Sequence, residues 1–287
     1  MRGVAVLAAL ALAAPLLAGC GAEPASSAGR PTVVASFYPL QYVAQRVVGD
    51  HAEVVDLTNP GVEPHDLEMS VDETMAVVDA TAVLYESGFQ PAVDEAVEQN
   101  SPRHVVDAAA VVHLRDDNPH FWQDPARMAD VAEAFTRTMS RADPRHADDY
   151  RQNLSALLRD LRSLDAAYRS GLAHCALHTV VVSHDAFGYL SKYGLRFVPI
   201  NGLSPEAEPS PAHIAALQDL IRSDHITTVF TETLASPELA DTLAHDLGIR
   251  TAVLDPIEGL TRRTADEDYL SLMRANLTHL QEANRCS

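Results

Sequence analysis

Three histidines lie in sequence surroundings that suit coordination of a metal ion. His65 follows two prolines and a glycine in the run PGVEPHDLE, and His120 follows a proline in NPHFWQDP, beside the only tryptophan of the chain. His184 comes directly after the β-rich run TVVVS. Prolines and bulky neighbours limit the freedom of these loops, so little conformational entropy is lost when a ligand binds. The three imidazoles are therefore candidate ligands.

A carboxylate completes a possible set of four ligands. Asp255 follows the apolar run AVL and precedes a proline. Three imidazole nitrogens and one carboxylate oxygen suit Zn²⁺, and four protein ligands leave no open position for catalysis. Any one of these histidines alone is better explained as a surface or buried structural residue. The positions of these residues in the sequence favour neither metal coordination nor a purely structural role.

Other titratable residues have weaker positions. Glu232 follows the predicted strand TTVFT and is a candidate either to orient an imidazole from behind or to coordinate the metal directly. His113 is expected to be exposed. The remaining histidines are expected to be structural or solvated: His51, His104, His146, His174, His178, His213, His225, His245 and His279.

The elements that must position these residues alternate along the chain. Strands are predicted at 32–36, 53–57, 82–85, 104–107, 179–183, 196–200, 227–231 and 251–254. Helices are predicted at 39–48, 71–79, 91–99, 125–141, 185–193, 211–222, 236–247 and 265–283. This alternation predicts an α/β fold with parallel sheets. Ligands of such sheets gather beyond the carboxyl ends of the strands, where the candidate residues fall.

A long amphipathic stretch separates two α/β halves. Leucines and tyrosines recur at three- and four-residue spacing from Pro144 to Ser170, after Asp143 as a potential N-cap. One helix of that length is about 40 Å long, and two helices with a bend are the alternative. We expect an N-terminal lobe at 31–141, a linking helix at 142–173 and a C-terminal lobe at 174–287, with the metal site in the cleft between the lobes.

The start of the chain is typical of an exported lipoprotein. An apolar run of 15 residues, VAVLAALALAAPLLA, follows Arg2 and ends in the quartet LAGC. A membrane-spanning helix needs about 20 apolar residues. We expect residues 1–19 to be a signal peptide, Cys20 to be lipidated and 20–30 to be a flexible tether. An ordinary signal peptide with an incidental cysteine is the alternative.

Cysteine count and charge bound the remaining possibilities. Cys175 and Cys286 form an even pair in an exported chain, which suggests a disulfide if the two lie close in space. The formal net charge is −19. An acidic chain of this kind argues against binding to nucleic acid and against electrostatic docking on anionic lipid.

Seven motifs, in order from Pro31 to the end of the chain, resemble one family. They are SFYPLQYVAQRVVGD, PGVEPHDLE, NPHFWQDP, SHDAFGYL, EAEPS, FTETLASPELA and LDP. Together they are similar to the zinc and manganese solute-binding lipoproteins of bacterial ABC importers, the ZnuA/TroA-like metal-binding family. The resemblance implies two α/β lobes joined by a long rigid helix. It also implies that the metal ligands are His65, His120, His184 and Asp255.

The same resemblance implies a function. We expect a Zn(II)-binding lipoprotein on the outer face of the bacterial cell membrane, monomeric, which delivers metal to an ABC permease and its ATPase. A Mn(II)-preferring member of the family and a surface adhesin with a structural metal are alternatives. Manganese members tend to have a carboxylate where this chain has His184. An extracellular metallohydrolase is disfavoured because neither HExxH nor GxSxG occurs.

Overall fold

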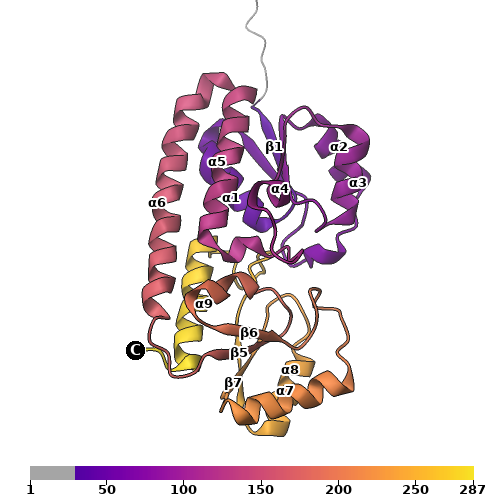
Figure 1. Ribbon diagram of the computed structural model, residues 1–287. Coiled ribbons are helices and arrows are strands. Elements are labelled where there is room, and N and C mark those ends of the chain that lie inside the picture. Colours follow the sequence, from indigo (N-terminus) through magenta and orange to yellow (C-terminus); the bar gives the residue numbers. More distant parts are fainter. Residues whose placement is uncertain (1–29) are drawn as a thin grey trace, which may run out of the picture.

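Two parallel sheets of four strands form the frame of the molecule (Figure 1). The computed structural model describes residues 30–287, so the predicted signal peptide (1–19), Cys20 and most of the tether lie outside the described residues. The first sheet has the order β2-β1-β3-β4, with β1 Thr32–Ala35, β2 Glu53–Asp56, β3 Ala82–Tyr85 and β4 Val105–Asp107. The second sheet has the order β6-β5-β7-β8, with β5 Thr179–Val182, β6 Arg196–Pro199, β7 Thr228–Thr231 and β8 Arg250–Val253. All paired strands are parallel, which confirms the α/β prediction.

Helices follow most strands and cover the sheets. In the first half they are α1 Tyr38–Val48, α2 Val71–Asp79, α3 Pro91–Asn100, α4 Ala108–Val112 and α5 Pro125–Ala142. In the second half they are α7 Pro211–Ser223, α8 Glu238–Leu247 and α9 Tyr269–Asn284. Short 3₁₀ turns occupy Gly49–His51 (η1), Pro64–Asp66 (η2), Phe121–Gln123 (η3), Pro144–His146 (η4) and Gly188–Tyr193 (η5).

The predicted long helix is a single helix, α6, Ala147–Gly171. It packs against α1 and α5 of the first half and against α9 of the second, and it runs beside both halves (Figure 1). Its start lies after the 3₁₀ turn η4. The Asp143 carboxylate contacts the His146 ring and accepts a hydrogen bond from the Tyr150 hydroxyl at 2.8 Å, so it fixes the α5–α6 corner.

The helix predicted at 185–193 is not present as an α-helix. Only the 3₁₀ turn η5 forms, over Gly188–Tyr193. The backbone of Asp185 is bonded across the chain instead, because its N–H donates to the Gly202 carbonyl and its own carbonyl accepts from the Asn118 amide. These long-range bonds hold residues 183–187 as an irregular loop and so present His184 to the cleft.

A hydrophobic core extends through both halves. One continuous cluster of buried side chains includes Val33 of the first sheet, Tyr168 of α6 and Met273 of α9. Because burial of apolar surface is the main stabilising term in folding, the two halves stabilise each other. We keep the division into lobes at 31–141 and 174–287, with a linking helix at 142–173, as a proposal.

A disulfide ties the end of the chain to the start of the second half. Cys175 and Cys286 are joined at an Sγ–Sγ distance of 2.01 Å across a sequence separation of 111 residues. The pairing expected from the even cysteine count is therefore present. Across residues 30–287, the helices are all too short or too polar to traverse a bilayer.

Candidate metal centre

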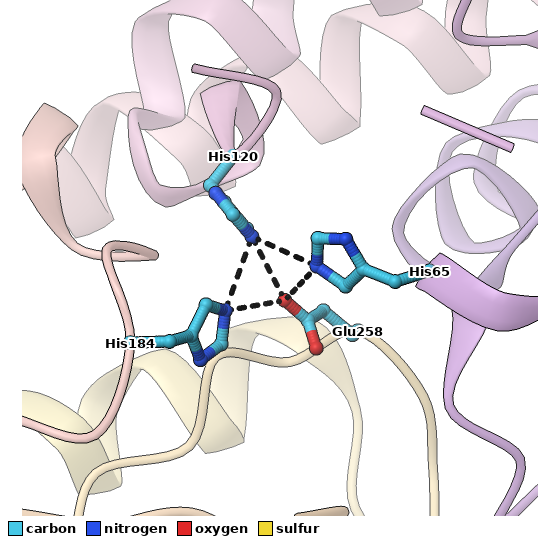
Figure 2. Close-up of side chains that lie close together, drawn as sticks. All are labelled: His65, His120, His184 and Glu258. Carbon is cyan, nitrogen blue, oxygen red and sulfur yellow. Dashed lines mark hydrogen bonds and ion pairs between the residues drawn. The ribbon is translucent and has the colours of Figure 1, made fainter. Parts of the chain in front are cut away.

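Three histidines and one glutamate converge between the two halves, as Figure 2 shows. His65 lies in η2 after β2, and His120 precedes η3. His184 lies two residues after β5, and Glu258 follows β8 by five residues. One nitrogen or oxygen atom from each residue lies within 4.8 Å of the others. Each half thus contributes two members of the cluster.

Five of the six separations between these atoms match the edges of a tetrahedron. The Nε2 atoms of His65 and His120 are 3.3 Å apart, and those of His120 and His184 are 3.2 Å apart. The Glu258 Oε1 atom lies 3.6, 3.1 and 3.3 Å from Nε2 of His65, His120 and His184. Metal–ligand bonds of about 2.0–2.1 Å define a tetrahedron with edges of about 3.3–3.4 Å. A four-coordinate first-row ion therefore fits the donor set.

Burial differs between the members of the cluster. The side chains of His120, His184 and Glu258 are fully buried, whereas 12% of the His65 side chain is exposed. We call the exposed edge of the cluster beside His65 its mouth. In the loop before His65, the Gly61 N–H donates to the Leu260 carbonyl at 2.7 Å, which joins the His65 loop to the Glu258 loop. The cluster is thus open to solvent only beside His65.

Asn118 orients the ring of His120. The Asn118 Oδ1 atom lies 2.9 Å from His120 Nδ1 and accepts the His120 backbone N–H at 3.0 Å. Its Nδ2 group donates to the Asp185 carbonyl at 2.8 Å, which identifies Oδ1 as the atom facing the ring. His120 therefore carries its proton on Nδ1 and presents the Nε2 lone pair to the cluster. Burial lowers the pKa of His120 to about 4.

Glu232 contacts the back of His184. Its Oε2 atom lies 2.8 Å from His184 Nδ1, on the opposite side of the ring from the cluster. Burial lowers the pKa of His184, but the Glu232 and Glu258 carboxylates outweigh burial and raise the pKa to about 10. Of the two roles considered for Glu232, the geometry fits the orienting role.

Glu258 carries the negative charge of the cluster. Burial favours its neutral form, but contacts with three histidines outweigh burial and hold the pKa of Glu258 well below its usual value. Without metal, the lowered pKa of Glu258 and the raised pKa of His184 favour an ionised carboxylate beside a protonated imidazole. A divalent cation that displaces this proton would find a buried site already arranged for positive charge.

The His65 turn is set by local sequence. Pro64 occupies the first position of η2, and the Glu63 carboxylate accepts the His65 N–H at 3.2 Å. The His65 ring packs edge-on against Phe89 at a centroid distance of 4.6 Å. Burial raises the pKa of Glu63 to about 7. The PGVEPH motif thus builds a short turn from which the His65 ring points toward the other three side chains of the cluster (Figure 2).

The structure brings together His65, His120 and His184 as predicted, but Glu258 stands in the place expected for Asp255. Asp255 is buried, and its Oδ1 atom accepts the Ile257 backbone N–H at 2.7 Å. Burial raises the pKa of Asp255 to about 6. This carboxylate is occupied within its own loop and is not a member of the cluster.

Sequence reasoning missed Glu258 because it favoured the first polar residue after the strand. The run LDPIEGL holds two carboxylates three residues apart, and no periodicity separates their roles in an irregular loop. His113 is exposed, as expected, and is not in the cluster.

Comparison with known proteins gives a family match over nearly the whole chain. The family model described as ZnuA, "Zinc-uptake complex component A periplasmic", matches residues 33–283. The zinc-binding lipoprotein AdcA of Streptococcus pneumoniae is 31% identical over 98% of this chain and 61% of its own length. The high-affinity zinc uptake system protein ZnuA of Bacillus subtilis is 30% identical over 93% of each chain.

A solved structure agrees with the fold. The Zn(II)-bound ZnuA-like domain of Streptococcus pneumoniae AdcA superimposes with a TM-score of 0.79 and 33% identity, covering 89% of this chain and 99% of that domain. The chain spans 56–61% of the length of the AdcA relatives that it matches.

Proposed function

The chain belongs to the ZnuA family of periplasmic zinc-uptake components, and from that premise we propose that it captures Zn²⁺ outside the cytoplasm for an ABC importer. Its ligands are the Nε2 atoms of His65, His120 and His184 and a carboxylate oxygen of Glu258. Zinc is the cargo of the protein. The names of relatives from two genera, which describe zinc binding and zinc uptake, support this proposal.

The observation that carries the proposal is the tetrahedral arrangement of the four donors. Three of them are fully buried, and the five measured separations lie between 3.1 and 3.6 Å. Bringing an ionised carboxylate and three imidazoles together in a buried space is unfavourable without a compensating charge. A bound dication supplies that charge, which is why the arrangement supports a metal site.

The donor set favours binding over catalysis. Catalytic zinc sites keep one coordination position for water or substrate, whereas closed sites use four protein ligands. Here all four positions are filled by side chains from two halves of the molecule. The proposed role is therefore reversible capture, and the family to which the chain belongs is one of solute-binding proteins.

The same donors favour zinc over manganese. Imidazole nitrogen suits zinc, while carboxylate and carbonyl oxygens suit manganese, and the intrinsic affinity order of divalent ions also places zinc above manganese. With three nitrogens and one oxygen, we expect Mn²⁺ to bind at least about 100-fold more weakly, or about 2.7 kcal/mol.

Location and partners complete the proposal. Lipidation of Cys20 would hold the protein on the outer face of the cell membrane, and the tether at 20–30 would let it reach the permease. The partner is an ABC permease with its ATPase, and the protein acts as a monomer. The word lipoprotein in the name of the AdcA relative supports the anchor.

Metal analysis of the purified protein tests the proposal. Titration with Zn²⁺ against a chelator of known affinity should give one tight site per chain, and competition by Mn²⁺ should be at least about 100-fold weaker. Zinc-limited growth of a strain that lacks the gene should be restored by the wild type and not by His120→Ala. Equal affinity for the two metals, or restoration by His120→Ala, would contradict the proposal.

A further inference from the structure

A strained turn delivers Glu258 to the cluster, and its neighbour Asp255 holds that turn. We propose that Asp255 is a positioning residue for metal binding, acting through the turn at residues 255–258 and not by touching the ion. The inference rests on the proposed zinc site, because it concerns how Glu258 becomes a ligand. It assigns a function to the buried carboxylate that the strand-end pattern predicted to be a ligand.

The strain lies at Ile257. This residue has a φ of 61°, in the left-handed region. A β-branched side chain disfavours that region more than other residues do, because Cβ approaches the following carbonyl. Such a conformation is energetically unfavourable and persists only where the surroundings enforce it. Ile257 is also fully buried, so its side chain fixes the turn from the inside.

Asp255 enforces the turn from one side. Its Oδ1 atom accepts the Ile257 N–H at 2.7 Å, a local bond that closes the backbone over Pro256. The backbone of Asp255 is itself fixed by Asn276 of α9, which accepts its N–H at 2.9 Å and donates to its carbonyl at 2.6 Å. The carboxylate is thus part of a chain of bonds from α9 to the residue before Glu258.

The first half of the molecule holds the same turn from the other side. The Pro256 carbonyl accepts the Trp122 indole N–H at 2.7 Å and the Gln123 side-chain amide at 2.5 Å. Trp122 and Gln123 lie two and three residues after His120 in the chain. The segment that carries one ligand therefore bonds the turn that carries another. Release of the turn would move Glu258 away from His120 and leave a buried imidazole cluster without its anion.

Three variants separate positioning from coordination. Asp255→Asn keeps an oxygen that can accept the Ile257 N–H, but it replaces a carboxylate with an amide, which is a poor zinc ligand. If Asp255 positions Glu258, zinc affinity stays within about threefold of the wild type in Asp255→Asn and falls about 10- to 100-fold in Asp255→Ala. In a Glu258→Ala background, Asp255→Ala should cause little further loss, because it acts through Glu258.

The metal-free protein offers a second readout. Trp122 is the only tryptophan of the chain, and its indole N–H contacts the turn directly. Its fluorescence should change in metal-free Asp255→Ala and stay as in the wild type in Asp255→Asn. Asp143→Ala is the matched control, because it removes another buried aspartate with structural hydrogen bonds, at the α5–α6 corner. That control should lower the melting temperature without changing zinc affinity or Trp122 emission.

The outcomes are distinct. A loss of tenfold or more in Asp255→Asn, with wild-type affinity in Glu258→Gln, would show that Asp255 is the ligand and would overturn the inference. Unchanged affinity and unchanged Trp122 emission in Asp255→Ala would overturn it as well. Failure of the wild type to bind Zn²⁺ alone would instead reject the proposed function, before any variant is compared.

Discussion

The two turns that face each other across the cleft mouth are built in different ways. The His65 turn is short and proline-fixed, and its ring keeps 12% of its surface exposed. The Glu258 turn is fully buried and is held by hydrogen bonds from α9 and from the segment after His120. Both turns place a donor atom in the same cluster. The His65 turn is set by its local sequence, whereas the Glu258 turn also depends on contacts with residues far along the chain.

The difference indicates a division of labour. His120, His184 and Glu258 are fully buried, and each is held by neighbouring side chains or backbone, so they form the fixed part of the site. The loop that carries His65 is joined to the Glu258 loop by one backbone hydrogen bond, from the Gly61 N–H to the Leu260 carbonyl. Local opening requires less free energy where few buried contacts are lost. We infer that zinc enters and leaves beside His65.

The largest effect is expected at the buried turn. Glu258→Gln keeps the volume of the side chain but removes the only anion among the four donors. Zinc affinity should fall at least about 100-fold, or about 2.7 kcal/mol. Competition against a chelator measures the loss, and a change below threefold would mean that Glu258 is not a ligand.

Comparing variants of His184 and His65 tests whether zinc enters and leaves beside His65. His184→Ala should reduce zinc affinity about as much as Glu258→Gln, because it opens a buried position. His65→Ala should reduce zinc affinity less than His184→Ala does. For a given loss of affinity, however, His65→Ala should increase the zinc dissociation rate by a larger factor. Stopped-flow transfer of zinc to a chelator measures the zinc dissociation rate of each variant. His113→Ala, an exposed histidine outside the cluster, is the control and should change neither. Equal dissociation rates in the two ligand variants would argue against entry beside His65.

Changing the pH should act oppositely on stability and on binding. The pKa of His184 is raised to about 10 in the metal-free protein, above its ordinary value of 6.5. A raised pKa stabilises the folded state below the ordinary value, and this stability is lost as the pH rises toward 10. Zinc must displace the same proton, so affinity should rise over that range by up to about tenfold per pH unit.

Denaturant unfolding of the metal-free protein and chelator competition, both between pH 7 and 9, check the two trends. In the His184→Ala variant, both the loss of stability and the rise in zinc affinity with increasing pH should be smaller than in the wild type. Zinc affinity that is flat or falls with pH in the wild type would show that no proton on His184 is displaced.

A smaller effect is expected behind His184. Glu232→Gln keeps an acceptor for Nδ1–H but removes the charge 2.8 Å from it. Partners of this kind tune ligand basicity, and their loss typically reduces metal affinity by 10- to 100-fold, so a loss of about tenfold is expected. The variant should also lower the pKa of His184, which NMR of the metal-free protein can measure. An unchanged pKa of His184 in Glu232→Gln would show that the Glu232 carboxylate does not tune the basicity of this ligand.

Much of the fold follows from local sequence patterns, and the same patterns make three of the four donors candidates, which the family resemblance then selects as ligands. Alternating strands and helices predict parallel sheets, and the strand-end rule places His184 beside His65 and His120. The periodicity of leucines and tyrosines likewise predicts α6 as one helix. Each of these depends on residues close in the sequence or on a general rule of sheet topology.

The errors arise where distant contacts decide the backbone. Residues 185–193 have a helical pattern, but the bonds of Asp185 to Asn118 and Gly202 prevent an α-helix from starting there. Ile257 is the residue type least expected in a left-handed turn, so nothing local predicts that Glu258 and not Asp255 faces the cleft. Asp255 closes that turn locally, but the contacts with Asn276, Trp122 and Gln123 that fix its place come from far along the chain.

The central claim is that three imidazoles and Glu258 enclose one zinc ion. A crystal structure of the zinc-loaded protein, with the ion located by anomalous scattering at the zinc edge, tests this most directly. We expect one ion per chain, about 2.0–2.1 Å from Nε2 of His65, His120 and His184 and from one oxygen of Glu258, in tetrahedral geometry. Zinc bound to Asp255 in place of Glu258, or held with open positions filled by water, would contradict it.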